Sequence, residues 1–502
     1  MPTQVNDQFA GIPESIPFEG PKSRNPMAFK YYNAEQVVAG KTMKEWLRFA
    51  VAYWHTWRGN GADIFGLDGS YDRPWDMANT LDAALARVDT HFEFCKRLGL
   101  EYYCFHDRDI CPEAGSVEET NEWMDKVADK LEAGQKETGV KVLWGTVNLF
   151  SHRRYMHGGP TNPDPAVVAM AAAQVKKCLE VTHRLGGENF VMWGGRDGYQ
   201  CLLNTDMELE QEQYATFLRA LRDYARSIGF KGQLLLEPKP REPSAHQYNF
   251  DAETTLGFLE RFDLIDDFAL NLEANHGTLA GHSGEHEVEV AASRGKLGSI
   301  DTNRNEMLLG WDTDMFPTDP VLATYTMKRV MEQGGLAPGG LNFDAKVRRE
   351  SVDVEDLFIG HINGMDNYAR GLLSAAKMIE EGQIDRMVDA RYADMVSTPL
   401  GQKISDGTAT LEEMAAFAAE HGEPENRSGK QEAIESISAW SDWKSRWCRS
   451  GLPRAPTTAS EGLRLPSTLV RRGRARPVSS PTNSPWPSSQ RPLTSSRHFR
   501  CV

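Results

Sequence analysis

The chain has 502 residues, about three times the length of one typical domain, which fits two or three domains or one large α/β barrel with additions. Apolar residues make up 40% of it and charged residues 25%, and 12 Trp and 21 Phe provide for a sizeable core, which excludes global disorder. The net charge of -15 disfavours a general nucleic-acid binder. Because the sequence has neither an apolar run of about eighteen residues nor a signal-peptide pattern, we expect a cytoplasmic protein with no membrane partner.

Eight short apolar runs alternate with amphipathic, helix-like segments along the first 444 residues. The runs are MAFKYYN near 28, EYYCFHD near 103, KVLWGTVN near 144, NFVMWGG near 191, GQLLLEPKP near 235, FALNLEANH near 270, LGSIDTN near 299 and GLNFDAK near 342. Two of the intervening segments end in glycine, at Gly186 and Gly229, as helices commonly do. This alternation favours the α/β class and a (β/α)8 TIM barrel over an open doubly wound sheet. No GxGxxG or GxxxxGK[ST] follows the first strands, so the common phosphate-binding motifs are absent.

Three regions follow from these patterns. Residues 1–355 are expected to form an N-terminal arm and the barrel with its catalytic site, and residues 356–444 a C-terminal helical extension that makes subunit contacts. From 445 to 502 the composition changes abruptly to eleven Arg, no Lys and one acidic residue, so this tail carries about +10 and the preceding residues about -25. Its Ser, Pro and Arg content predicts disorder or an appended, out-of-frame segment. Binding of the basic tail to nucleic acid or an acidic membrane is the alternative.

The seven cysteines are scattered and never form CxxC, which argues against a disulfide framework or a thiolate zinc site. We expect them to be reduced core residues.

Ionisable side chains stand at the ends of five of the apolar runs: His106, Glu237, Glu273, Asp301 and Asp344. In a barrel of parallel strands these positions share the carboxyl rim, where such barrels carry their active sites. Any one of them alone is commonly a loop residue or a helix cap. Five together are expected to converge, and converging carboxylates repel one another unless a cation lies between them.

The ligand types indicate which cation this would be. His276 follows Glu273 by three residues, and the segment Trp311-Asp312-Thr313-Asp314 adds two carboxylates, although alone it would be a polar loop. Six carboxylates and one imidazole without a thiolate favour Mg²⁺, Mn²⁺ or Co²⁺ over zinc. They are too many for one small octahedral ion, so two metals bridged by Glu273 are expected.

Long motifs in this sequence resemble the xylose isomerase family, in its longer-chain class II form. They are WHTWRGNGADIFG, FHDRDICPE, WGGRDGYQCLLNTD, EPKPREPSAHQY, LEANHGTLAGH, GSIDTNR, GWDTDMFP and GGLNFDAKVRR, and the resemblance runs from about residue 5 to about residue 437. It implies one metal on Glu237, Glu273, Asp301 and Asp344, and a second on Glu273, His276, Asp312 and Asp314.

The resemblance also implies the reaction, which is interconversion of D-xylose and D-xylulose and, less well, of D-glucose and D-fructose. His106 with Asp109 would transfer the proton that opens the sugar ring, and Lys239 would polarise O1. A hydride shift between C2 and C1 would follow with two divalent cations, Mg²⁺ or else Mn²⁺ or Co²⁺. Trp54, Trp193 and Phe65 would exclude water, with Phe65 supplied by a neighbouring subunit of a homotetramer. The family further suggests a cis Glu237-Pro238 bond.

Three alternatives remain at this point. A two-metal nuclease on the same barrel would need basic residues around a phosphate, and a body at about -25 opposes it. A non-catalytic sugar-binding protein would not need two metals and a paired His106. An isomerase for a different aldose would use the same residues, and the sequence ranks neither the aldoses nor the metals.

Overall fold

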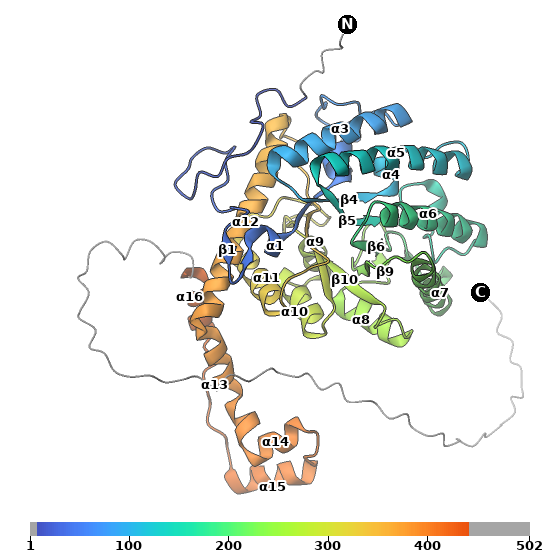
Figure 1. Ribbon diagram of the computed structural model, residues 1–502. Helices are drawn as coiled ribbons and strands as arrows, with labels where there is room; N and C mark the ends of the chain where they lie inside the picture. The colour runs from blue at the N-terminus through green and yellow to red at the C-terminus, as the bar shows by residue number, and fades with distance from the viewer. Residues whose placement is uncertain (1–7, 441–502) are drawn as a thin grey trace, which may run out of the picture. The chain divides into compact units, whose positions relative to one another are not determined.

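Eight parallel strands close into a barrel at the centre of the computed structural model, which describes residues 8–440 (Figure 1). Around the barrel the strands follow the order β10-β11-β12-β3-β4-β5-β6-β8, and every neighbouring pair is parallel. Their bounds are β3 Phe49–Ala52, β4 Tyr102–His106, β5 Lys141–Thr146, β6 Asn189–Trp193, β8 Gln233–Glu237, β10 Phe268–Glu273, β11 Leu297–Asp301 and β12 Leu341–Phe343. The predicted α/β TIM barrel is therefore confirmed.

The long helices that follow the strands cover the outside of the barrel. They are α3 Leu81–Leu98, α5 Val117–Thr138, α6 Pro165–Arg184, α7 Met207–Ser227, α8 Ala252–Arg261, α10 Gly284–Ser293, α11 Pro320–Glu332 and α12 Val354–Glu381. The sequence sets their ends: Ser116 and Asp164 cap the N-termini of α5 and α6, and Gly99 and Gly139 end α3 and α5 in the left-handed conformation.

Shorter elements lie between these strands and helices. They are β1 Val37–Val38, β2 Lys41–Thr42, α1 Met43–Leu47, α2 Tyr53–Arg58, α4 Asp107–Ile110, β7 Gly198–Tyr199, β9 His246–Gln247, α9 Ala274–Ala280 and the 3-10 turns Arg153–Tyr155 and Leu202–Asn204. Of these, α2, α4 and α9 start directly at the carboxyl ends of β3, β4 and β10, so they carry residues straight onto the rim of the barrel.

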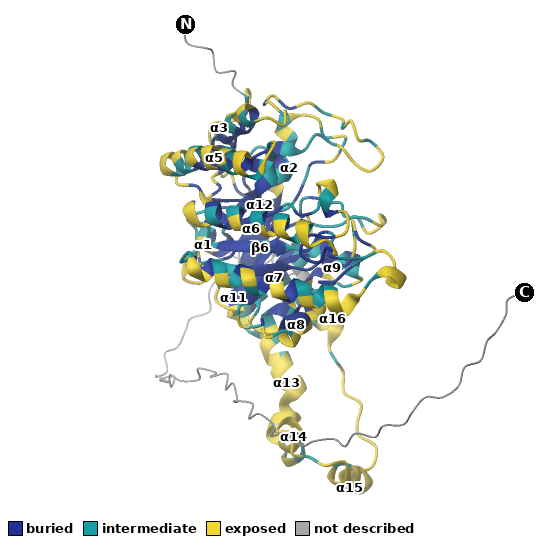
Figure 2. Cartoon of the chain, turned by 90° about the vertical axis from the view of Figure 1, so that its right-hand side faces the viewer, coloured by how far each residue is buried: buried dark blue, intermediate teal, exposed yellow. Residues whose placement is uncertain are grey.

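Alternate residues of the strands face two apolar layers. Ala50, Cys104, Trp144 and Leu235 belong to a small cluster inside the barrel, while a larger cluster fills the space between strands and helices. Figure 2 shows the strands in the buried colour and the outer helix faces exposed. Of the cysteines in the described residues, Cys95, Cys104, Cys111 and Cys178 are buried, as predicted, whereas Cys201 is exposed, so its prediction as a core residue was wrong.

The first barrel strand is not the one that the sequence predicts. MAFKYYN near residue 28 lies outside the barrel, where the backbone N–H groups of Lys30, Tyr31 and Tyr32 donate to the carboxylate of Asp366 on α12 instead of to a neighbouring strand. The first strand is β3, four buried residues that pass without a turn into α2. Aromatic residues are typical of strands, but here they pack a surface arm against α12.

Helix α12 begins at Val354, close to the start of the expected extension at residue 356, but it follows β12 and its buried inner face packs on the barrel. The helices after it are α13 Gln383–Ser397, α14 Pro399–Ser405, α15 Leu411–His421 and α16 Gln431–Trp440. In α13, α14 and α15 only Gly401 is buried, as Figure 2 shows by their yellow surface. The subunit contacts expected of residues 356–444 stay a prediction, and the basic tail 445–502 lies outside the described residues. No helix between residues 8 and 440 is long and apolar enough to span a membrane.

Candidate metal and catalytic site

The carboxyl end of the barrel gathers all seven residues that the sequence suggests as metal ligands. Glu237, Glu273 and Asp301 are the last residues of β8, β10 and β11, and Asp344 follows β12 directly. The others come from the segments after these strands: His276 from α9, and Asp312 and Asp314 from the loop between β11 and α11. Parallel strands that end together thus bring residues up to 107 positions apart onto one rim.

Glu273 stands at the centre of this group. Its ligand atoms lie within 4.8 Å of those of three different pairs, which are Glu237 with His276, Asp312 with Asp314, and Asp301 with Asp344. A carboxylate shared among several sets of ligands is the geometry of a bridge between two cations. No other member of the seven lies in as many of these groups.

Crowding of buried carboxylates shifts the pKa values on one side of the rim upward. Burial, with the charges of Asp312 and Asp344, raises the pKa of Glu273 well above its usual range. Burial and the charge of Glu237 do the same to Asp301. The pKa of Glu237 rises to about 6, mainly because of burial. Without a cation, then, burial and mutual repulsion disfavour the ionised form of all three carboxyl groups.

Lys239 supplies positive charge at the opposite side. Its Nζ lies 2.7 Å from Oδ2 of Asp312, and the two side chains are only 6% and 11% exposed. Burial opposes ionisation of Asp312, but Lys239 and His276 outweigh it and hold the pKa of Asp312 well below its usual range. Burial likewise opposes the charge of Lys239, yet Asp312 and Asp314 raise the pKa of Lys239 above its ordinary value. Asp312 and Lys239 are therefore both charged.

Among the seven predicted ligands, two buried polar atoms have no hydrogen-bond partner in the described residues. They are Nδ1 of His276 and Oδ1 of Asp312. Leaving a buried polar atom unpaired costs about 1–3 kcal/mol, so such atoms usually have a partner that the chain itself does not provide. An imidazole nitrogen and a carboxylate oxygen both bind divalent cations, so the residues present fit a metal.

Three buried amides on or beside β10, β11 and β12 hold carboxylates in place, and the sequence reasoning missed them, as it missed Asn275 on α9, which donates to Oδ1 of Asp314 at 3.2 Å. Asn271 donates to Oε2 of Glu237 at 3.0 Å and to Oδ2 of Asp301 at 2.6 Å, and Asn342 donates to Oδ1 of Asp301 at 2.6 Å. Asn303 donates to Oε1 of Glu273 at 2.7 Å. Each of the three amides lies two residues from a predicted ligand, on the same strand or directly after it. Side chains two residues apart on a strand point to the same face, so this spacing could have revealed the amides from the sequence.

His55 and Trp54, from α2, contact two other carboxylates of the rim, those of Asp314 and Asp344. Nε2 of His55 lies 3.1 Å from Oδ2 of Asp314 and 2.9 Å from Oδ1 of Asp344, and Nε1 of Trp54 donates to Oδ1 of Asp344 at 2.8 Å. Burial would lower the pKa of His55, but the two carboxylates outweigh burial and raise it to about 9. The sequence reasoning missed His55 because the strand before it, β3, was not recognised.

The predicted catalytic pair is present. Nδ1 of His106, the last residue of β4, lies 2.8 Å from Oδ2 of Asp109. Burial would lower the pKa of His106, but Asp109 outweighs it and the pKa is raised. The carboxylate also fixes the ring, so that Nε2 remains for proton transfer.

Aromatic rings surround this histidine. Trp54 lies edge-on to His106 with ring centroids 4.5 Å apart, and Phe150, also missed by the sequence reasoning, lies between His106 at 5.6 Å and Trp193 at 4.6 Å. Nζ of Lys239 is 5.1 Å from the centre of a Trp193 ring. Two of the three predicted wall residues therefore line the rim beside the catalytic groups.

The third, Phe65, is placed differently. It lies on the loop between α2 and α3, 81% exposed, with its ring 5.9 Å from that of Trp311. It forms no wall with Trp54 and Trp193 within its own chain, so its role in a neighbouring subunit stays a prediction.

The suggestion of a cis Glu237-Pro238 bond was wrong. Between residues 8 and 440 the cis bonds are Glu242-Pro243 and Ala337-Pro338. After β8 the chain stays extended, because Lys239 N–H donates to Asn249 O and Pro240 O accepts from Gln247 N–H. The extended segment places Lys239 at the site without a cis bond before it.

Comparison with known proteins gives relatives over most of the chain. A family model described as "Xylose isomerase-like TIM barrel" matches residues 92–310, and one described as "XylA2 C-terminal domain" matches residues 388–438. Xylose isomerase of Arabidopsis thaliana is 53% identical over 432 residues, 86% of this chain and 90% of that protein. Xylose isomerase 2 of Xanthomonas campestris is 54% identical over 434 residues, 86% of this chain and 97% of that protein. Xylose isomerase of Thermoanaerobacterium thermosaccharolyticum is 51% identical, covering 84% of this chain and 96% of that protein.

Proposed function

The chain belongs to the xylose isomerase family and is an isomerase, and we propose that it interconverts D-xylose and D-xylulose, with D-glucose and D-fructose as a poorer pair. The observation that carries the proposal is the position of Glu273 between three pairs of ligands on the rim, beside a buried histidine–aspartate pair. A sugar that must open its ring and then move hydrogen between two carbons needs both a proton-transfer group and positive charge near its oxygens.

Membership of the family implies that the enzyme uses divalent metal, and we propose two ions per subunit, of the Mg²⁺, Mn²⁺ or Co²⁺ class. Glu273 would bridge them, with Glu237, Asp301 and Asp344 on one ion and His276, Asp312 and Asp314 on the other. When bound, the two cations would hold neighbouring sugar oxygens and stabilise negative charge on them, which favours transfer of hydrogen with its electron pair. The oxygen-rich ligands support this class of ion over zinc.

The side chains of the chain then have separate tasks. His106, oriented by Asp109, exchanges a proton with the ring oxygen and O1 as the aldose opens. Lys239 is held by Asp312 at 2.7 Å with its charge kept inside the site, and this charge stabilises O1 as electron density builds there. Trp54, Phe150 and Trp193 keep water from the carbons between which hydrogen moves.

The substrate is tested by a panel of aldoses. Chelated protein is reloaded with Mg²⁺, Mn²⁺ or Co²⁺ in turn, and kcat/KM is measured for xylose, glucose, ribose and rhamnose. We expect xylose to give the highest value with each active metal. A higher kcat/KM for another aldose would keep the isomerase and replace its substrate.

The route of the hydrogen is tested by running the reaction in D₂O. A direct shift between C2 and C1 leaves almost no deuterium on C1 of the ketose, as proton NMR of the product would record. If His106 or another base removed the C2 proton instead, solvent exchange would place deuterium at C1. Stoichiometric labelling there would overturn the hydride shift.

We further propose, from the family, a homotetramer in the cytoplasm in which Phe65 completes the site of a neighbouring subunit. Its 81% exposure and its place on a loop with the exposed Ile64 and Leu67 support this proposal. Sedimentation of the full chain measures the assembly. We expect Phe65→Ser to raise KM for the sugar while the tetramer persists, and an unchanged KM would remove Phe65 from the site.

A further inference from the structure

A second group of metal-ligating side chains lies outside the carboxylate rim. His282, from the link between α9 and α10, and His286 and Glu287, from the first turns of α10, place one ligand atom each within 4.8 Å of one another. The two imidazole rings lie nearly parallel with centroids 4.6 Å apart. Asp251, which caps the N-terminus of α8, reaches the same group, and its Oδ2 is 3.2 Å from Nε2 of His282.

The start of α8 holds both carboxylates by one oxygen each. Oδ1 of Asp251 accepts from the N–H of Thr254 at 2.7 Å, and Oε2 of Glu287 accepts from the N–H of Ala252 at 2.8 Å. The second oxygens, Oδ2 of Asp251 and Oε1 of Glu287, lie 3.2 and 4.0 Å from Nε2 of His282. The helix end therefore fixes the two carboxylates with one oxygen of each directed at the same imidazole.

Glu287 is buried, and the carboxylate of Asp251 and the imidazoles of His282 and His286 lie around it. Its side chain is 5% exposed, and burial together with the charge of Asp251 raises its pKa. The groups whose charges favour its ionised form are the two histidines, which supply full positive charge only when protonated. A divalent ion would neutralise both carboxylates with the imidazoles uncharged.

We propose that His282, His286, Glu287 and Asp251 form a binding site for one zinc ion, separate from the catalytic rim. Two imidazoles and two carboxylate oxygens are a donor set of the kind that zinc takes in tetrahedral geometry, whereas Mg²⁺ prefers oxygen alone. Ligand atoms about 2.0–2.1 Å from a tetrahedral ion lie roughly 3.3 Å from one another, close to the separation of His282 and Asp251. The ligand atoms of His282, His286 and Glu287 lie within 4.8 Å of one another, so an ion would draw them closer by about 1 Å or more.

Zinc bound here would join the start of α8 to the corner between α9 and α10. Because α9 carries His276, this corner supports one side of the catalytic rim, but none of the four proposed ligands belongs to the rim. The zinc would stabilise the fold and take no part in the chemistry.

The test is a difference in zinc content between matched full-length variants. Wild-type protein and His286→Gln are chelated, dialysed against Zn²⁺ and analysed by mass spectrometry of the metal, with circular dichroism as the check of folding. We expect His286→Gln to hold one zinc fewer per chain. This difference does not depend on how many ions the rim binds, so its outcome tests the zinc site separately from the proposed function. His183→Gln, an exposed histidine on α6, is the control and should keep the wild-type content.

A second variant and a second metal make the test independent of whether His286→Gln folds. If His286→Gln does not fold, His282→Gln replaces it. Co²⁺ is then added to chelated wild type and to the folded variant, because tetrahedral Co²⁺ with nitrogen ligands absorbs visible light far more strongly than octahedral Co²⁺ on oxygen ligands. We expect the variant to lose the strong band. Equal zinc content in wild type and variant, or an unchanged cobalt spectrum, would overturn the site.

Discussion

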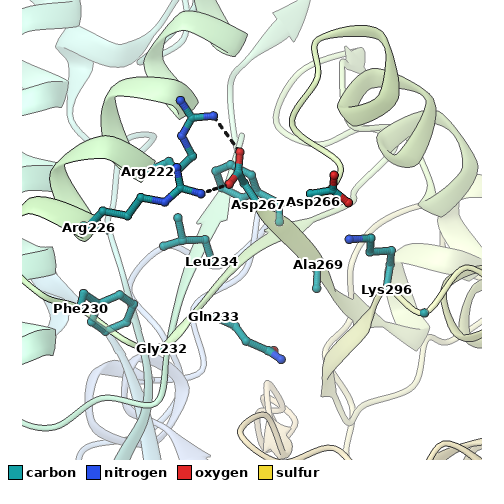
Figure 3. Close-up of a pocket in the computed structure, with 13 residues that line it drawn as sticks. Arg222, Arg226, Phe230, Gly232, Gln233, Leu234, Asp266, Asp267, Ala269 and Lys296 are labelled. Carbon is teal, nitrogen blue, oxygen red and sulfur yellow. Dashed lines mark hydrogen bonds and ion pairs between the residues drawn. The ribbon is translucent and has the colours of Figure 1, made fainter. Parts of the chain in front are cut away.

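The two ends of the barrel differ in whether their charged side chains are paired with opposite charges. At the carboxyl end, Glu273 is buried among other carboxylates and its pKa is raised well above the usual range. At the amino end, a cavity of about 360 Å³ is also lined by charged residues, but Asp267 there is paired with Arg222 at 2.7 Å and with Arg226 (Figure 3). Two strands connect both ends: β8 begins at Gln233 in the cavity and ends at Glu237 on the rim, and β10 begins at Phe268 in the cavity and ends at Glu273 on the rim.

This difference separates charges that stabilise the fold from charges that need a ligand. Paired charges such as Asp267 and its arginines are satisfied within the chain, so a cavity with charged walls is not by itself a binding site. Like charges gathered in a buried place destabilise the chain until something else neutralises them, which is the condition of a metal site. The comparison predicts that substitutions at the two ends have different consequences.

The largest effect is expected from removing one negative charge at each end. Glu273→Gln takes away the bridge between two cations and should lower kcat/KM by about 10³-fold or more, since one well-placed electrostatic group is commonly worth 10²–10³-fold. Asp267→Asn should leave kcat and KM unchanged and lower the free energy of unfolding by roughly 1–2 kcal/mol, because Arg226 is largely exposed. Steady-state kinetics and urea unfolding of both variants measure this. Loss of activity in Asp267→Asn with intact folding would contradict the division between the ends.

Removal of Mg²⁺ should affect stability through the carboxylate rim and not through the amino end of the barrel. A cation that binds only the folded protein at 100 times its Kd adds about 2.7 kcal/mol per site, so chelation should lower Tm and abolish activity. Chelation should lower the Tm of Asp267→Asn as much as that of wild type, because this substitution lies at the other end of the barrel. Chelation should lower the Tm of Glu273→Gln much less. Calorimetry of the three proteins with and without Mg²⁺ would show this. An equal metal effect on Tm in all three would mean that the stabilising ion binds away from Glu273.

The pH dependence of the metal-free protein follows from the raised pKa values. Glu237 has a pKa of about 6 in the folded chain against an ordinary 4.5, so the folded state binds this proton more tightly. The resulting stability is present in full below about pH 4.5 and is lost as pH rises through about 6. His55, with a pKa of about 9 against 6.5, adds a loss of the same sign as pH rises through about 9. Asp312 and Asp344 have lowered pKa values and act in the opposite sense, but below about pH 4.

We therefore expect the Tm of chelated protein to fall as pH rises from about 5 to about 7, and Mg²⁺ to remove most of that fall. Differential scanning calorimetry at several pH values gives the slope. Glu237→Gln should make this slope smaller because the neutral amide does not titrate, and the part that comes from Glu273 and Asp301 should remain. A Tm of chelated protein that rises with pH over this range would reverse the assigned sign.

Strand ends were predictable from the sequence because each ligand follows an apolar run directly. Glu237, Glu273, Asp301 and Asp344 needed only the rule that parallel strands end on one rim. The strand β3 was missed because its four residues run into α2 without a turn, so a period of two has no room to appear. His55 was lost with it. Its contacts with Asp314 and Asp344 join positions about 260 and 290 residues away, which no local pattern reports.

The smallest effect on activity is expected from Trp54, whose side chain donates a hydrogen bond to a carboxylate of the rim. Trp54 has two contacts there: its N–H donates to Asp344 at 2.8 Å, and its ring centroid lies 4.5 Å from that of His106. Trp54→Phe keeps an aromatic wall and removes only the N–H. Because groups that orient a ligand are worth about 10–100-fold in metal affinity, we expect the Kd for metal to rise about tenfold and kcat at saturating metal to stay close to wild type.

Trp54→Ala removes the wall as well and should lower kcat even at saturating metal. Metal titrations followed by activity give both constants. If Trp54→Phe lowered kcat at saturating metal as much as Trp54→Ala, the N–H would act on the reaction itself and not on the charge of Asp344.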